Sequence, residues 1–193
     1  MLLLAWFFLW RNTKMSILVY HNGVLATDTQ FLDLRAVGGT YNMSYGTKLF
    51  MSKDKKFYYG VLGAKLNKEQ KMMLEKVLNV LEGYKRTGVI TDKITKHLTS
   101  TIRGLNCEVI ALSTRYVYEI TQVPNEAVPW AIRDLTETTV IGSASMFAWA
   151  AIDVLDSASD AVKHCVAYDI TCGGKVEYRT LKKLKEINNV AVL

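Results

Sequence analysis

Proline is scarce in this chain, with 2 among 193 residues, and no low-complexity run or internal repeat interrupts the sequence. Nothing therefore marks a linker or a disordered tail, and we expect one compact domain. Long apolar runs are also missing. The run from Leu2 to Trp10 spans about half of the roughly 20 residues that a membrane-crossing helix needs. Its basic neighbours, Arg11 and Lys14, follow it, whereas a signal peptide carries basic residues in front. Three interpretations of this stretch follow: an upstream extension, a propeptide, or a short membrane or partner anchor. We favour the first two and expect no membrane partner.

Cysteine and histidine are equally rare, with three of each. An odd number of cysteines without a C-x-x-C pair indicates neither a zinc site nor a disulfide framework. A reducing, cytoplasmic location is the simplest expectation. The histidines are far apart in the sequence, which argues against a metal site or a histidine-based triad. We expect neither a metal nor a cofactor.

The excess of basic residues is modest, with 24 Lys and Arg against 18 Asp and Glu, a net charge of +6. A nucleic-acid binder would gather these charges on one face. Here they are spread along the chain and cluster only at 53–56 and 182–185. The pattern therefore disfavours nucleic acid as a partner.

The most informative stretch runs from Met15 to Asp28. Two apolar segments flank Asn22-Gly23, the strongest short signal for a two-residue β-hairpin. Such a turn pairs residues whose numbers sum to 45, which sets Asp28 opposite Ile17, one step inside Ser16. Strict alternation then points Ser16 and Asp28 to opposite faces of the hairpin. If Met15 is an initiator that is removed, Ser16 carries a hydroxyl and a free α-amine together.

Strand and helix patterns come in blocks along the rest of the chain. The expected elements are four strands within 16–64, helices 67–81 and 92–103, strands 107–113 and 116–122, a loop 124–134, a strand 138–141, helices 146–155 and 157–168, a strand 172–178 and a helix 180–187. Blocks of like elements favour segregated layers over alternating βαβ units. We expect an α+β fold built as a four-layer α-β-β-α sandwich. Residues 1–15 would form an extension or propeptide, and 16–193 the domain.

Three separated motifs resemble one protein family. The segment 23–28 (GVLATD) resembles the second strand of proteasome β-subunits, and 48–50 (KLF) with 60–63 (GVLG) resembles their lysine strand and the glycine-ended strand after it. The segment 168–178 (YDITCGGKVEY) resembles their RDxxSGGxVxxY element, and Ile141-Gly142-Ser143 before a helix also fits. The likeness covers Ser16 to about Ile187. The family is that of the N-terminal-nucleophile hydrolases, whose fold is the same sandwich.

This resemblance implies roles for individual residues. Ser16 would stand where the family has its N-terminal threonine nucleophile, with Asp28 and Lys48 as the neighbouring carboxylate and ammonium. Gly63 would supply the oxyanion-hole amide. Ser143 would match a supporting serine of the family, and Asp169 its second carboxylate. Cys172 stands where the family has another serine.

The implied function is that of a threonine-type endopeptidase with serine as nucleophile, acting through an acyl-enzyme in protein catabolism. Its substrates would be peptides or unfolded proteins, and its assembly a homo-oligomeric ring with a possible ATPase partner. Two alternatives are open at this point. One is a catalytically silent structural or assembly subunit that keeps Met15 or the whole extension. The other is an amidohydrolase of small amides on the same fold.

Overall fold

The structure, a computed structural model, describes residues 16–33, 42–63, 65–121 and 128–190. Within these residues the chain is an α+β protein with antiparallel sheets. The strands are β1 (Ile17–His21), β2 (Val24–Asp28), β3 (Gln30–Asp33), β4 (Asn42–Tyr45), β5 (Leu49–Met51), β6 (Tyr58–Gly63), β7 (Cys107–Leu112), β8 (Tyr116–Ile120), β9 (Trp130–Asp134), β10 (Thr139–Gly142) and β11 (Val176–Thr180). The helices are α2 (Lys68–Thr87), α3 (Asp92–Leu105), α4 (Ser145–Leu155), α5 (Ala158–Tyr168) and α6 (Leu181–Val190). None of the described helices is both long and apolar enough to cross a membrane.

The β1–β2 hairpin forms as the sequence predicts. Asn22 and Gly23 both have positive φ, 46° and 76°, as a type I′ turn requires. Leu18 pairs with Thr27 and His21 with Val24, so the numbers of paired residues sum to 45. The hairpin is the centre of a four-stranded sheet with the order β10-β1-β2-β11.

Both faces of this first sheet are buried, and alternate residues of β1 contact different partners. Ile17 and Val19 pack in a cluster with residues of α4 and α5. Leu18 and Tyr20 pack in another cluster with Leu49, Tyr58 and further residues of the second sheet. A sheet covered on both faces explains why β1 reads as a continuous apolar run rather than an alternating one.

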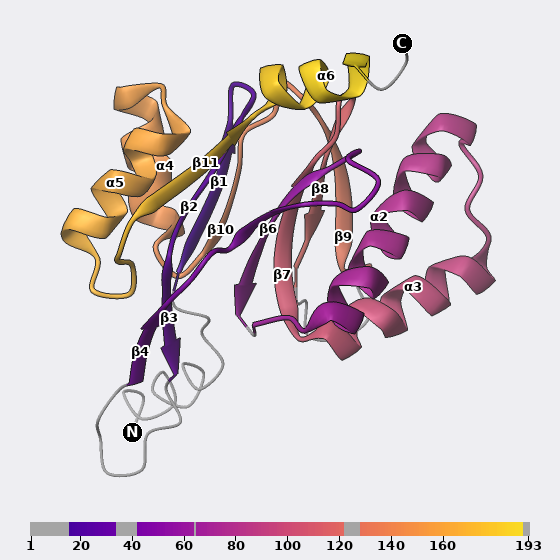
Figure 1. The fold of residues 1–193 in the computed structure, drawn as a ribbon, viewed down its shortest axis with the longest axis horizontal. Coiled ribbons are helices and arrows are strands. Elements are labelled where there is room, and N and C mark those ends of the chain that lie inside the picture. Colours follow the sequence, from indigo (N-terminus) through magenta and orange to yellow (C-terminus); the bar gives the residue numbers. More distant parts are fainter. Residues whose placement is uncertain (1–15, 34–41, 64, 122–127, 191–193) are drawn as a thin grey trace, which may run out of the picture.

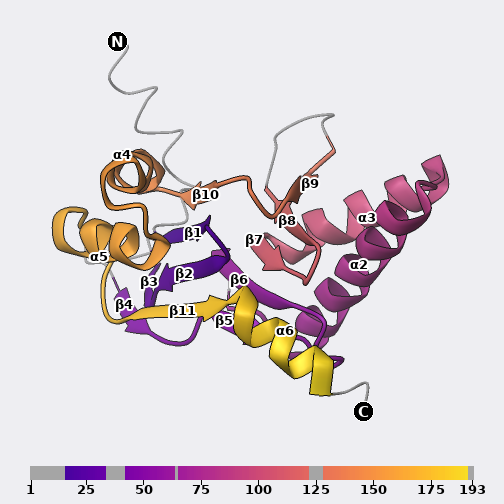
Figure 2. The ribbon, with the colours of Figure 1, turned by 90° about the horizontal axis from the view of Figure 1, so that it is seen from above.

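The second sheet has five strands in the order β5-β6-β7-β8-β9. Its other face packs against α2 and α3 through apolar residues such as Tyr59, Val109, Leu78 and Ile102. In Figures 1 and 2, α4 and α5 lie at one side of the molecule and α2 and α3 at the other, with the sheets between them. Strand β5 of the second sheet contacts β11 of the first sheet.

The structure corrects three expectations about element boundaries. The strand expected at 172–178 is β11, Val176–Thr180, and residues 172–175 precede it. Helix α2 begins at the predicted cap, Asn67, but it continues through Gly83 and ends at Gly88, whose φ of 71° is left-handed. The described part of the expected 124–134 loop contains an edge strand, β9, which starts directly after Pro129. An edge strand tolerates a neighbouring proline because one side needs no ladder hydrogen bonds. Residues 122–127 lie outside the described residues, as does the predicted 1–15 extension with Met15.

Candidate active site

The start of β1 carries the predicted nucleophile. Ser16 is buried, and its hydroxyl donates a hydrogen bond to Asp28 Oδ1. The backbone amide of Ile17 donates to the same oxygen at 3.2 Å. Alternation alone would keep Ser16 and Asp28 apart. They meet because Ser16 precedes the first residue of β1, so the strand's alternation does not extend to it.

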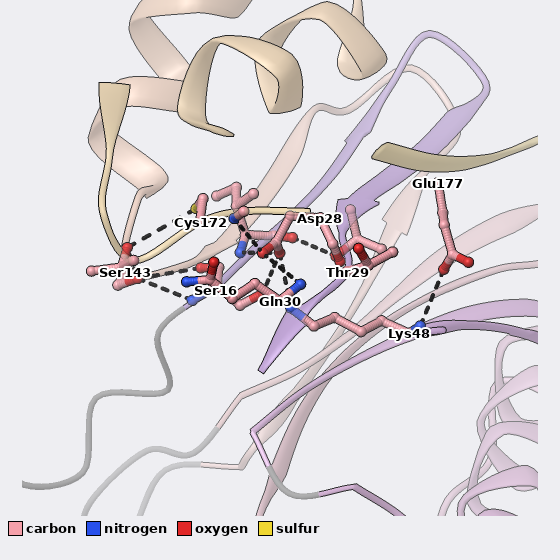
Figure 3. A network of polar contacts seen from close by, with 12 residues as sticks. Ser16, Asp28, Thr29, Gln30, Lys48, Ser143, Cys172 and Glu177 are labelled. Atoms are coloured by element: carbon pink, nitrogen blue, oxygen red, sulfur yellow. Dashed lines mark hydrogen bonds and ion pairs between the residues drawn. The ribbon is translucent and has the colours of Figure 1, made fainter. Parts of the chain in front are cut away.

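Lys48 completes a buried three-residue contact. It directly precedes β5, and Figure 3 shows its extended side chain reaching from the second sheet to the start of the hairpin. Its Nζ lies 2.9 Å from Asp28 Oδ1 and also donates to the hydroxyl of Ser16. The Lys48 and Asp28 side chains are 1% and 0% exposed, respectively. A buried charge needs a partner because water no longer solvates it, and each of these two residues supplies the other.

Asp28 is held by the backbone as well as by side chains. Its second oxygen, Oδ2, accepts the amides of Gln30 and Gly173, each at 3.2 Å. Gly173 belongs to the segment before β11, which resembles the family's glycine pair. A side chain at this position would have its Cβ 2.0 Å from Gln30 Oε1. A side chain at position 173 would therefore displace the Gln30 side chain, which packs over this backbone.

Burial changes the proton affinity of Lys48. Loss of solvation lowers the pKa of its ammonium below the ordinary 10.5, while the attraction of Asp28 and the hydrogen bond to it act in the opposite direction. Lys48 therefore releases its proton more readily than a lysine in water.

A second chain of polar contacts leads away from the backbone nitrogen of Ser16. This nitrogen donates to Ser143 Oγ at 3.1 Å, and Ser143 Oγ lies 2.8 Å from Thr171 Oγ1. Thr171 in turn donates to Asp169 Oδ1 from its hydroxyl at 2.5 Å and from its amide at 2.7 Å. The structure thus joins Ser143 directly to Ser16, and it joins Asp169 to Ser143 through Thr171. No sequence signal selects Thr171, because a threonine close to a glycine pair is common in turns.

The two remaining positions from the family likeness contribute differently. Gly63 ends β6 with a φ of 93°. Among the described residues, the hydrogen bonds of Ser16, Asp28 and Lys48 given above do not include Gly63. The amide of Val61, two residues earlier, donates to the carbonyl of Lys48 at 3.1 Å. Cys172 is buried beside Asp28, and burial first, then that carboxylate, raises the pKa of its thiol. A neutral, buried thiol is a packing residue rather than a nucleophile.

Gly142 fixes the backbone where the site begins. Its φ is 120°, and a Cβ there would lie 2.1 Å from the carbonyl oxygen of Ser16. That carbonyl accepts the amide of Ser143 at 3.0 Å. We expect Gly142→Ala to cost about 1–3 kcal/mol of unfolding free energy and to reduce any activity by displacing Ser16. Urea unfolding measures the first effect.

Gly83→Ala is the matched control. Gly83 lies inside α2, and a Cβ there meets nothing within 4 Å. The same substitution should stabilise the protein by about 0.5–1 kcal/mol, since alanine loses less backbone entropy in a helix. Equal effects at the two positions would contradict the role assigned to Gly142.

Compared by sequence, the chain matches no protein-family model and no curated protein. Compared by structure, it is similar to eukaryotic HslV from Trypanosoma brucei, with a TM-score of 0.50 at 17% identity, over 85% of this chain and 97% of that one. The structure of BPH from Thiobacillus denitrificans in complex with epoxomicin has a TM-score of 0.47 at 16% identity, over 85% of this chain and 96% of that one. The structure of an Anbu mutant from Hyphomicrobium sp. strain MC1 has a TM-score of 0.47 at 12% identity, over 92% of this chain and 94% of that one. In fold, the chain resembles the proteasome-like N-terminal-nucleophile hydrolase HslV, as its sequence motifs predicted.

Proposed function

We propose that this protein is a proteasome-like endopeptidase that cuts peptide bonds through an acyl-enzyme on Ser16, once Ser16 is the first residue. The observation that carries the proposal is the buried contact of the Ser16 hydroxyl with both Lys48 and Asp28 at the start of β1. The proposal includes the four-layer α-β-β-α sandwich of the family for residues 16–193 and the absence of 1–15 from the working enzyme.

The proposed chemistry begins with the Ser16 hydroxyl, which is a weak nucleophile until a base takes its proton. A free α-amine on Ser16 would be that base, because its ordinary pKa of about 7.7–8.0 leaves a useful fraction neutral at cellular pH. The Lys48 ammonium lowers the pKa of the amine by like-charge repulsion and polarises the hydroxyl. Asp28 keeps Lys48 charged and in place.

Two groups would serve the later steps. The nitrogen of Ser16 donates to Ser143, which Thr171 links to Asp169, so this chain of contacts would fix the position of the α-amine. The amide of Gly63 would bind the oxyanion of the tetrahedral intermediate, a donor typically worth about 2.7–4 kcal/mol in such sites. The α-ammonium then gives its proton to the leaving amine, the peptide C–N bond breaks, and the amine product departs from the acyl-enzyme. The neutral α-amine next takes a proton from water, which hydrolyses the ester and releases Ser16. No metal or cofactor enters this scheme.

This mechanism predicts a bell-shaped dependence of kcat/KM on pH. The acid limb reports the α-amine, which must lose its proton, and should fall below about pH 8. The alkaline limb reports Lys48, which must keep its proton, and should lie below the ordinary 10.5 because burial lowers the pKa of this lysine. Initial rates on a fluorogenic peptide between pH 5 and pH 11 measure both limbs. An activity that is still rising at pH 11 would exclude a charged, buried Lys48 from the mechanism.

The proposal extends to a homo-oligomeric ring in the cytoplasm that takes peptides or unfolded proteins, with an ATPase as a possible partner. Helix α4 supports the assembly, because large apolar side chains stand exposed along it: Met146, Phe147, Trp149, Val154 and Leu155. Monomers seldom leave such a face uncovered. Light scattering coupled to gel filtration should give a mass of several chains, and a mass of one chain would contradict the ring.

A further inference from the structure

Glu177 lies at the junction of the two sheets. It is in β11, opposite Thr27 of the hairpin. One carboxylate oxygen, Oε2, accepts the backbone amide of Lys48 at 3.2 Å, and the other accepts the hydroxyl of Thr47 at 3.0 Å. Figure 3 shows this carboxylate beside the backbone of Lys48, at the opposite end of the residue from Ser16. Glu177 therefore links a strand of the first sheet to the two residues that precede β5 of the second.

We propose that Glu177 is a positioning residue for Lys48, which fixes the backbone of the lysine across the two sheets so that its ammonium meets Ser16 and Asp28. This inference rests on the proposed function, because it assigns Glu177 a part in the same reaction. Glu177 itself is bound to Thr47 and to the backbone of Lys48, and it takes no direct part in the proposed chemistry. Nothing in the family motifs selects this position.

The need for such a residue follows from the length of the lysine side chain. Lys48 has four rotatable bonds between its backbone and Nζ, so a small shift of the backbone changes where the ammonium arrives. The backbone is held by Glu177 at its amide and by Val61 at its carbonyl, 3.1 Å away. The ammonium is held by Asp28 and lies 4.9 Å from the centre of the Phe31 ring. Holding both ends of Lys48 restricts where its ammonium lies. A displacement of a catalytic group by about 1 Å can lower the rate by about 100-fold.

Charge gives Glu177 a second influence on Lys48. The ionisable groups that face Lys48 are Asp28 from β2, Cys172 from the segment before β11, and Glu177 from β11. Asp28 acts most strongly, through its charge and its hydrogen bond, and Glu177 acts in the same direction. Removing the charge of Glu177 while keeping its shape should therefore lower the pKa of Lys48.

Glu177→Gln is the test, made in the full, assembled protein. Glutamine keeps the length of the side chain and one acceptor oxygen, but its amide group cannot accept the second hydrogen bond. We expect kcat on a fluorogenic peptide to fall by a factor on the order of 10 with KM unchanged. We also expect the alkaline limb of the pH profile to move to lower pH. A purely structural role would lower the amount of folded protein without moving that limb.

Two variants serve as controls. Thr47→Val removes one hydrogen bond of Glu177 and leaves its charge, so the alkaline limb should stay at the wild-type position. Glu186→Gln removes a carboxylate from the surface of α6, where it pairs with Lys183, and should leave both rate and pH profile unchanged. If Glu177→Gln and the wild type have the same kcat and the same position of the alkaline limb, the inference is wrong and the proposed function stands.

A direct titration separates this inference from the proposed function. In protein labelled with ¹³C-lysine, the Lys48 signal is identified by its loss in Lys48→Met, and its pKa is read from its shift with pH. A lower value in Glu177→Gln than in the wild type supports the inference even if the wild type hydrolyses no peptide. Equal values overturn it where kcat is also unchanged or where the wild type hydrolyses no peptide.

Discussion

Ser16→Ala should abolish peptide hydrolysis, with kcat reduced by a factor on the order of 10⁴ or more, as when other serine nucleophiles are removed. The hydroxyl is the only group of Ser16 that contacts both Lys48 and Asp28, and alanine leaves no atom to form the acyl-enzyme. Rates on a fluorogenic peptide, with matched amounts of folded protein, measure the effect.

The substitution should also leave removal of the initiator methionine unchanged. Removal of an initiator methionine requires a small residue after it, and both serine and alanine meet that requirement. Ser100→Ala is the control, because Ser100 is exposed on α3, and it should retain full activity. Undiminished hydrolysis by Ser16→Ala would rule out Ser16 as the nucleophile.

Lys48→Met should have the second largest effect, on stability as well as on activity. It removes the ammonium 2.9 Å from Asp28 Oδ1 and leaves a fully buried carboxylate without its cation. Breaking one partner of a buried ion pair typically costs about 3–5 kcal/mol. We expect a loss of that size in urea unfolding, together with loss of hydrolysis.

The double variant Asp28→Asn with Lys48→Met separates the two effects. Removing both charges avoids an unpaired buried ion, so part of the stability should return. The recovery should be partial because asparagine has one oxygen to replace the two that accept backbone amides. Activity should not return at all. Strictly additive losses of stability would contradict the pairing of Lys48 with Asp28.

The hairpin and the core of the site were predictable because they depend on short-range rules. Asn22-Gly23 determines the turn, the turn determines the register, and the register brings Asp28 beside Ile17 and hence near Ser16. Residues of β1 pack against α4 and α5 on one face and against the second sheet on the other, as a continuous apolar run indicates. The direct contact of Ser16 with Asp28 was not predictable, because it depends on where β1 begins.

The contacts that the sequence could not reveal are formed between distant segments. Thr171 matters because the turn before β11 brings it to Ser143, and Glu177 matters because β11 passes the start of β5. Neither residue carries a local signal. The end of α2 was misplaced because a glycine inside a helix costs only roughly 1 kcal/mol. The helix therefore continues past Gly83 to the left-handed cap at Gly88.

The most direct test of the account is to determine the N-terminus of the purified, active protein. Intact mass spectrometry gives the first residue, and a peptide vinyl sulfone, which alkylates an activated hydroxyl, identifies the nucleophile. The account predicts a chain that starts at Ser16 and carries the label on that residue. A chain that keeps Met1 or Met15 and remains unlabelled would contradict it and favour a silent structural subunit.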